Sequence, residues 1–201
     1  MISVDGRETG MEIKQFQNLE EILLKIMDGG ELEGRIVTDV FVNNESFSEI
    51  YPHQAEDIEA GEITSVEVKS VPVADMALEV TVELDKVVAL MEQGARRVAE
   101  LFRQAEDAEA LEVFQDLMDV TRDFLNMVGV LRGESLRVGA PAFDAAAEEI
   151  SNLFSEMVEV LENEDWILLA DLLEYEFIPS MSRFKGVIAE LRESFRQHDK
   201  E

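Results

Sequence analysis

Carboxylates are the most abundant side chains in this sequence that could do chemistry. The 201 residues include 45 Asp and Glu against 17 Lys and Arg, two histidines and no cysteine. Two neighbouring carboxylates can act as general acid and base when burial raises the pKa of one of them. Glu148 with Glu149 and Asp171 with Glu174 have such spacing. Because such pairs arise by chance in so acidic a chain, we predict no catalytic residues and expect most carboxylates to be solvated.

Metal and cofactor chemistry has little support in the sequence. A ferritin-like di-metal centre needs Glu-x-x-His pairs on two helices, and neither His53 nor His198 has a Glu three residues before it. The absence of cysteine excludes disulfides, thiolate zinc sites, iron–sulfur clusters and cysteine nucleophiles. Neither a Gly-x-Ser-x-Gly turn nor a glycine-rich phosphate loop occurs. An oxygen-only Mg²⁺ or Ca²⁺ site stays open because carboxylates are abundant, but we predict no metal and no cofactor.

The net charge of -28 restricts the kinds of partner that this chain can bind. Nucleic acids and anionic membranes carry charge of the same sign, and proteins bind them through Lys and Arg. The first residues show no basic region followed by an apolar stretch, and no segment has the roughly 20 apolar residues of a membrane-spanning helix. We therefore expect a cytoplasmic protein whose partner is another protein, not nucleic acid or a membrane. A homo-oligomer stays open.

The strongest local charge feature is an acidic stretch. Residues 141–178 contain eleven Asp or Glu and no Lys or Arg. The candidate partner-binding residues are carboxylates on the expected outer face of one helix, together with two aromatic residues of types enriched at interfaces: Glu148, Glu149, Glu156, Glu159, Trp166 and Tyr175. The alternative is that the carboxylates only keep the protein soluble. Trp166 and Tyr175 would then pack in the core, because they share a helical register with Leu169 and Leu173.

Two kinds of element must position these residues, because the apolar periodicity changes from two residues to about 3.6 near Pro72. This change predicts an α+β protein of two domains. Residues 1–73 are expected to form a small mixed sheet with one helix. Residues 74–201 are expected to form an antiparallel four-helix bundle.

The first domain is expected to contain four strands and one helix, and a further small strand stays open. The strands are predicted at residues 2–4, 11–16, 36–42 and 63–71, and the small strand would lie at 47–50. Asp5-Gly6 favours a tight turn between the first two strands, because glycine accepts a positive φ. Asn18 is a suitable N-cap for the helix, and Gly29-Gly30 is a suitable end for it.

This order of elements resembles the ubiquitin-like β-grasp fold. The resemblance covers residues 1–71 and implies a mixed sheet wrapped around one helix. Sulfur carriers of that fold use a free carboxy-terminal Gly-Gly. Because Gly29-Gly30 lies inside the domain, we do not expect carrier chemistry.

Four amphipathic stretches follow in the second domain. Apolar residues recur every three or four positions over residues 80–101, 111–128, 146–160 and 165–195. Short links between such helices predict an up-down-up-down bundle. Pro179 lies inside the fourth stretch, where it removes a backbone donor and its ring would clash with the carbonyl of Tyr175. We expect a kink or break there.

Two hypotheses about function follow. The first is a non-enzymatic adaptor, scaffold or assembly chaperone that binds a basic or amphipathic-helical protein through an acidic bundle face. Its rival is an enzyme, or a sensor of a small molecule or divalent ion, with a site in the bundle or between the two domains. Self-association through an exposed apolar stripe is compatible with either hypothesis.

Overall fold

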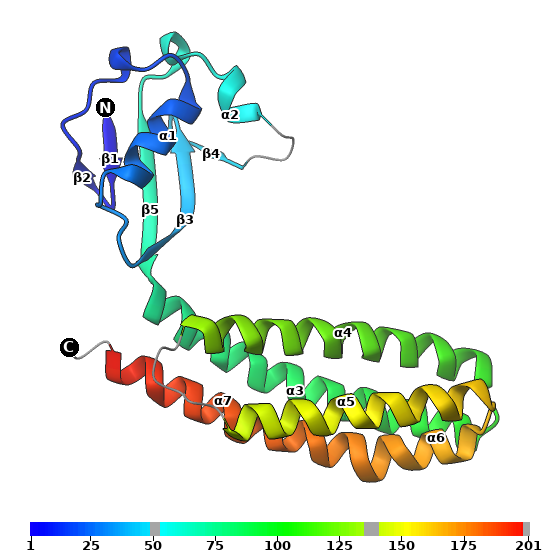
Figure 1. The fold of residues 1–201 in the computed structure, drawn as a ribbon. Helices are drawn as coiled ribbons and strands as arrows, with labels where there is room; N and C mark the ends of the chain where they lie inside the picture. The colour runs from blue at the N-terminus through cyan, green and yellow to red at the C-terminus, as the bar shows by residue number, and fades with distance from the viewer. Residues whose placement is uncertain (49–52, 135–140, 199–201) are drawn as a thin grey trace. The chain divides into compact units, whose positions relative to one another are not determined.

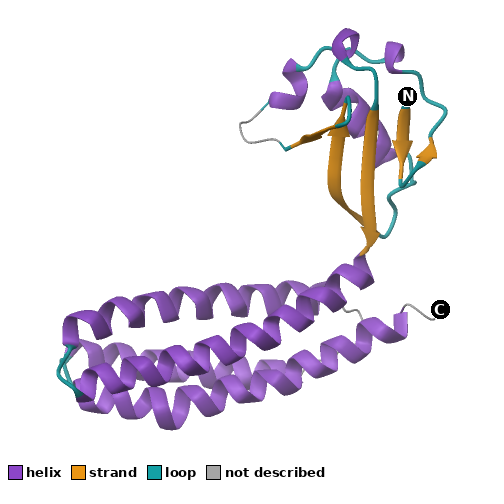
Figure 2. Cartoon of the chain, turned by 180° about the vertical axis from the view of Figure 1, so that it is seen from behind, coloured by secondary structure: helices purple, strands orange, loops and turns teal. Residues whose placement is uncertain are grey.

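The computed structural model describes residues 1–48, 53–134 and 141–198. The chain divides into two compact units, Met1–Met76 and Ala77–Glu201; the sequence placed this division after residue 73. Strands gather in the first unit and helices make up the second (Figure 2). The prediction of an α+β protein is therefore confirmed.

The first unit contains a five-stranded mixed sheet. Its strands are β1 (Ile2–Val4), β2 (Arg7–Glu8), β3 (Arg35–Val42), β4 (Glu45–Phe47) and β5 (Val66–Pro72), in the order β2-β1-β5-β3-β4. β1 and β5 run parallel, whereas the other neighbours are antiparallel. This mixed sheet is consistent with a β-grasp-like topology. The small strand considered at 47–50 shares only Phe47 with β4; Ser48 is not in a strand, and residues 49 and 50 lie outside the described residues.

The first hairpin is tighter than the sequence suggested. Asp5 and Gly6 have φ values of 47° and 77°, so that Val4 pairs directly with Arg7 across a two-residue turn. The prediction of a strand at residues 11–16 is wrong, because the second strand is already complete at Glu8. Residues 11–16 instead contain the 3-10 turn η1 (Ile13–Gln15) and place apolar side chains against the core of the first unit.

Helix α1 (Leu19–Asp28) packs on one face of this sheet (Figure 1). The Asn18 side chain accepts a hydrogen bond from the backbone N–H of Glu21 at 3.0 Å, which confirms the predicted N-cap. The helix ends at Gly29, and Gly30 follows in the left-handed region with a φ of 77°. The short helix α2 (Gln54–Asp57) and the 3-10 turn η2 (Ala60–Glu62) precede β5.

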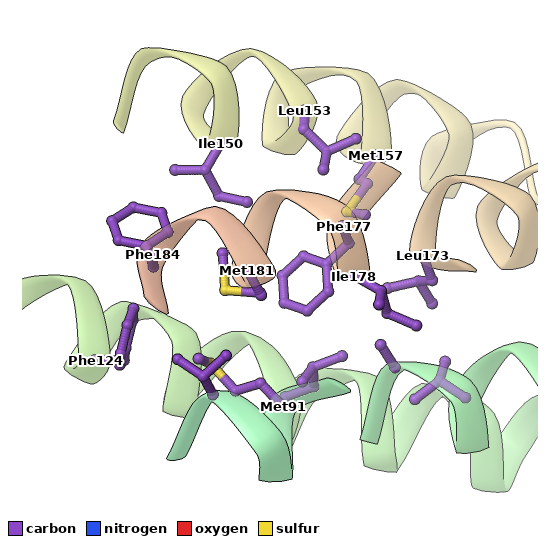
Figure 3. Packing of buried hydrophobic residues seen from close by; sticks show 14 of the residues in the cluster. Met91, Phe124, Ile150, Leu153, Met157, Leu173, Phe177, Ile178, Met181 and Phe184 are labelled. Carbon is purple, nitrogen blue, oxygen red and sulfur yellow. The ribbon is translucent and has the colours of Figure 1, made fainter. Parts of the chain in front are cut away.

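The second unit is an antiparallel four-helix bundle, as predicted. Its helices are α3 (Val73–Arg103), α4 (Asp107–Glu134) and α5 (Pro141–Glu162), followed by a fourth built from α6 (Trp166–Leu172), the π-helical turn η3 (Leu173–Phe177) and α7 (Ile178–His198). Phe177, Met181 and Phe184 of the fourth helix lie between α5 and the pair α3 and α4 (Figure 3). None of the helices in the described ranges is both long and apolar enough to cross a membrane.

The break expected at Pro179 takes the form of the π turn that precedes it. The backbone N–H of Ile178 donates to the carbonyl of Leu173, five residues earlier. A π turn takes in one residue more than an α turn, so the chain reaches Pro179 without a break in the fourth helix.

Candidate partner-binding groove

Several residues considered for a catalytic or metal site are paired with other side chains. Asp171 and Glu174 bind Arg103 at 2.8 and 2.6 Å, and these hydrogen bonds raise the pKa of Arg103 above its usual value. His53 is exposed and lies 3.2 Å from Glu56. Across the described residues, no three His, Asp or Glu side chains gather in a way that could hold a metal ion. The side chain of His198 lies outside the described part of the structure.

An apolar groove runs between α4 and α5. It has a volume of about 390 Å³. We call it the α4–α5 groove, and its lining residues are Phe114, Met118, Asp119, Arg122, Phe154, Met157, Val158 and Leu161. Phe114 and Met157 form a buried floor, whereas the Val158 side chain is 53% exposed. The groove is therefore an apolar surface open to solvent.

The groove exists because the apolar faces of both helices are wider than the bundle core requires. Along α5, Ile150, Leu153 and Met157 point into the core. Phe154 and Val158 each follow a core residue by one position, which rotates them by about 100° towards α4. Met118 of α4 lies on the corresponding flank of its helix. A helix with so wide an apolar stripe keeps apolar surface uncovered in a four-helix bundle.

The two helices that form the groove are strongly acidic. α4 carries seven acidic residues and two arginines, and α5 carries six acidic residues and no basic residue. Both arginines form ion pairs with carboxylates of the same two helices. Arg122 binds Asp119 at 2.8 Å and Asp123 at 3.2 Å, and Arg132 binds Asp144 at 2.8 Å. The charges of α4 and α5 that form no ion pair with a described residue are therefore acidic.

The four candidate carboxylates do not share one environment. Glu148, Glu156 and Glu159 are exposed on α5, and their side chains form no ion pair with a described residue. Glu149 is half-buried and forms an ion pair with Arg183 of α7. The expectation that Glu149 adds to an unneutralised acidic face is wrong, because its position on α5 turns it towards α7.

The two candidate aromatic residues also lie in different environments. Trp166 stacks on Phe102 with ring centroids 5.2 Å apart and an interplanar angle of 3°, so it packs against the bundle core. Tyr175 is 68% exposed. The expectation that Tyr175 packs in the core is wrong, because it lies two residues from both Leu173 and Phe177 and so points away from the face that they share. Neither aromatic residue lines the α4–α5 groove.

Sequence reasoning missed the groove itself. Met118 and Met157 lie on the apolar stripes of their helices, where a core position is the simplest expectation, and Met157 is buried. The available signal was the second apolar stripe of α5, Phe154, Val158 and Leu161, which runs beside the stripe that fills the core. A sequence pattern shows that a stripe is wide, but not which neighbouring helix leaves it uncovered.

Family comparisons agree with a two-part chain. Residues 1–71 match the model of a family described as "Domain of unknown function (DUF8043)", and residues 79–199 match that of a family described as "Domain of unknown function (DUF8042)". No curated protein and no solved structure gives a significant match. The second match spans more than half of the chain, so the chain belongs to the DUF8042 family.

Proposed function

We propose that this protein is a non-enzymatic interaction module that binds a basic amphipathic helix of a protein partner in the α4–α5 groove. The observation that carries the proposal is an open apolar groove between two helices whose unneutralised charges are all acidic. An adaptor, a scaffold and an assembly chaperone would all use such a surface. The proposal includes a cytoplasmic location, and it assigns the first unit to the β-grasp fold without a carrier role.

The apolar part of the groove suits a helix. Phe154, Val158 and Leu161 follow one another by four and three residues, so they form a straight line along α5. An amphipathic helix presents its own anchors with the same spacing and can lie along this line. Met118 and Met157 supply flexible, polarizable side chains that adapt to different anchors. The groove therefore selects an apolar helical face without demanding one sequence.

The charged part of the groove selects a basic partner. Glu148, Glu159 and Glu162 are exposed on α5, and none of their side chains forms an ion pair with a described residue. Lys and Arg on the polar edges of the bound helix would meet these carboxylates. Complementary charge of this kind accelerates association and weakens with salt. An acidic helix with the same apolar face would be repelled.

Methyl NMR with a designed peptide tests this proposal. The probe is an amphipathic helix of Leu and Lys, and its control replaces every Lys with Glu. We expect the Leu/Lys peptide to shift the methyl signals of Met118 and Met157. Met27 is 64% exposed on α1 in the first unit and serves as an internal control. Equal shifts at Met27 would mean that the peptide binds only through general charge attraction, which would contradict the proposal.

A pair of matched variants separates apolar contact from charge. Val158→Asp adds a negative charge but removes an apolar anchor from the groove, so we expect it to weaken Leu/Lys peptide binding by about tenfold. Leu90→Asp adds the same charge at a leucine of α3 that is 59% exposed and lies outside the groove. This control should bind as the wild type does. Unchanged or tighter binding by Val158→Asp would remove the groove from the proposal.

A small apolar ligand is the second candidate for the same groove, since about 390 Å³ falls within the range of small-molecule pockets. A sensor of this kind predicts that a metabolite raises the melting temperature of the bundle in a concentration-dependent way. A broad library that leaves the melting temperature unchanged would count against this candidate and leave the peptide proposal intact.

A further inference from the structure

A second apolar hollow lies on another side of α4, where it meets α3. We call it the α3–α4 notch, and its volume is about 190 Å³. Its lining residues are Leu90, Met91, Gly94, Val113, Asp116, Leu117 and Val120. None of these residues lines the α4–α5 groove. The notch therefore calls for a separate explanation.

Gly94 forms the open side of the notch, and the packing of the bundle does not require a glycine there. A Cβ atom at this position would lie 3.4 Å from the Leu117 Cδ1 atom, which is an ordinary van der Waals contact. Glycine in a helix interior is less stable than alanine. Gly94 thus weakens α3 without relieving a clash inside the monomer, which is expected if another side chain occupies the space above it.

Leu90 supplies a side chain of the right kind. It lies one helical turn before Gly94 on the same face of α3 and is 59% exposed. We infer that two copies of this chain associate through their α3–α4 notches about a twofold axis, with Leu90 of each copy inserted over Gly94 of the other. A twofold axis between Leu90 and Gly94 makes such a contact self-complementary. The packing is that of a knob in a hole.

Charge favours a second copy at the notch. Between Lys86 and Arg97, α3 presents Ala89, Leu90, Gln93 and Gly94 on this side, none of which is charged. At the two ends, Lys86 binds Glu83 and Arg97 binds Glu109, each at 2.7 Å. Asp116 is the charged residue of the notch lining, and it forms no ion pair with a described residue.

The antiparallel arrangement also places opposite charges together. Met91 and Thr121 are joined by a hydrogen bond of 3.4 Å, which fixes the level of α3 along α4. Reversal of α3 about the twofold axis brings Lys86 of one copy to the level of Asp116 on α4 of the other. Lys86 of each copy therefore faces the unpaired Asp116 on α4 of the other.

Sedimentation velocity on the full chain tests this inference, using the two aspartate variants already described. The wild type should show a concentration-dependent dimer. Leu90→Asp should weaken dimerisation by about tenfold or more, because it removes the central anchor. Val158→Asp adds the same charge at a side chain of similar exposure outside the notch and should dimerise as the wild type does. In the peptide titration, Val158→Asp should lose binding and Leu90→Asp should serve as the control.

Gly94→Ala provides a readout that a purely structural role would not give. The added methyl group removes the cost of glycine in α3 and fills part of the notch. The monomer should therefore unfold at a higher temperature while the dimer dissociates more readily. A wild type that stays monomeric at all concentrations would overturn the inference. So would equal dimerisation by Leu90→Asp and Val158→Asp, or a Gly94→Ala dimer as tight as the wild type.

Discussion

At the scale of single residues, a charged cluster at one end of the sheet controls the response of the first unit to acid. Both carboxylate oxygens of Asp5 accept hydrogen bonds at 2.8 Å, one from the Ser70 backbone N–H and one from its hydroxyl. Arg35 lies 3.1 Å from the same carboxylate. These bonds to Ser70, followed by the charge of Arg35, hold the pKa of Asp5 below its ordinary value of 3.8. The ionised form therefore stabilises the fold.

Asp5→Asn is predicted to destabilise the first unit in a pH-dependent way. The asparagine keeps the left-handed conformation, in which Asp5 has a φ of 47°. A lowered pKa gives stability that is complete above the unfolded pKa and is lost as the pH falls through the folded pKa. Because Asp5 is partly exposed, we expect a loss of about 1 kcal/mol at neutral pH. The difference from the wild type should vanish in strong acid.

Hydrogen exchange of sheet amides such as that of Val68 measures this effect. Glu8→Gln, at an exposed carboxylate on the same hairpin, is the control for the loss of one negative charge. Equal effects of the two variants, or a loss that persists in strong acid, would show that the hydrogen bonds of Asp5 are not the cause.

Two serines of α7 form a second test at this scale. The Ser180 hydroxyl is buried and has no hydrogen-bond partner among the described residues, whereas the Ser182 hydroxyl donates to Glu92 at 2.9 Å. A buried polar group without a partner costs about 1–3 kcal/mol. Ser180→Ala should therefore raise the melting temperature of the bundle, and Ser182→Ala should lower it. Trp166 fluorescence reports both, and a Ser180→Ala variant of lower stability would contradict the prediction.

Residue-scale features were predictable where they depend on neighbours in the sequence. The cap at Asn18 and the helix end at Gly29-Gly30 involve only residues within one or two turns. The surroundings of Glu149 and Tyr175 depend on which helix lies alongside and on the local helical pitch. That information is spread over the whole bundle, so both expectations failed.

At the scale of elements, the π turn keeps the fourth helix in register with the core. Leu169, Leu173, Phe177 and Met181 are all fully buried and each is four residues from the next. In a regular α-helix four residues exceed one turn by about 40°, so three such steps would rotate the buried face by about 120°. The extra residue taken in by η3 offsets this drift. The run of four-residue steps, together with Pro179, was the sequence signal for it.

This explanation predicts that one residue can be deleted from the π turn. Deletion of Tyr175, which is exposed, should convert η3 into an α turn. It is combined with Pro179→Ala, because proline in a regular helix costs about 3 kcal/mol. The matched control is deletion of Glu156, an exposed residue in the regular helix α5. The first variant should remain folded, whereas the second should rotate half of α5 out of the core and unfold. Similar losses in thermal melts would refute the role assigned to η3.

The groove and the notch show why surfaces at this scale resist prediction. The apolar periodicity predicted each helix of the bundle. The short links between the helices predicted that neighbours run antiparallel. Val158 and Leu90, however, each follow or precede a core residue by one position, and periodicity alone does not show whether a neighbouring helix covers them. Only the packing of α5 and α3 against α4 decides that these two side chains stay exposed.

At the scale of the whole molecule, the chain has two hydrophobic cores that share no residue. Ile2, Leu19 and Val68 belong to the core of the first unit, and Met91 and Phe184 to that of the second. The change of apolar periodicity near Pro72 predicted this division, because a sheet and a helical bundle bury apolar residues at different spacings along the sequence. Each core is formed by the helices and strands of one unit alone, so we expect each unit to fold without the other.

We therefore predict that residues 73–201, which keep α3 complete, fold without the first unit. Trp166 is the only tryptophan and reports on the bundle. Its thermal transition in the fragment should agree with that in the full chain to within about 2–4 °C, which corresponds to about 1 kcal/mol for a domain of this size. In the full chain, Asp5→Asn should leave the Trp166 transition unchanged, and Ser180→Ala should leave the exchange of Val68 unchanged. An unfolded fragment, or an effect of either substitution on the other unit, would mean that the two cores depend on each other for stability.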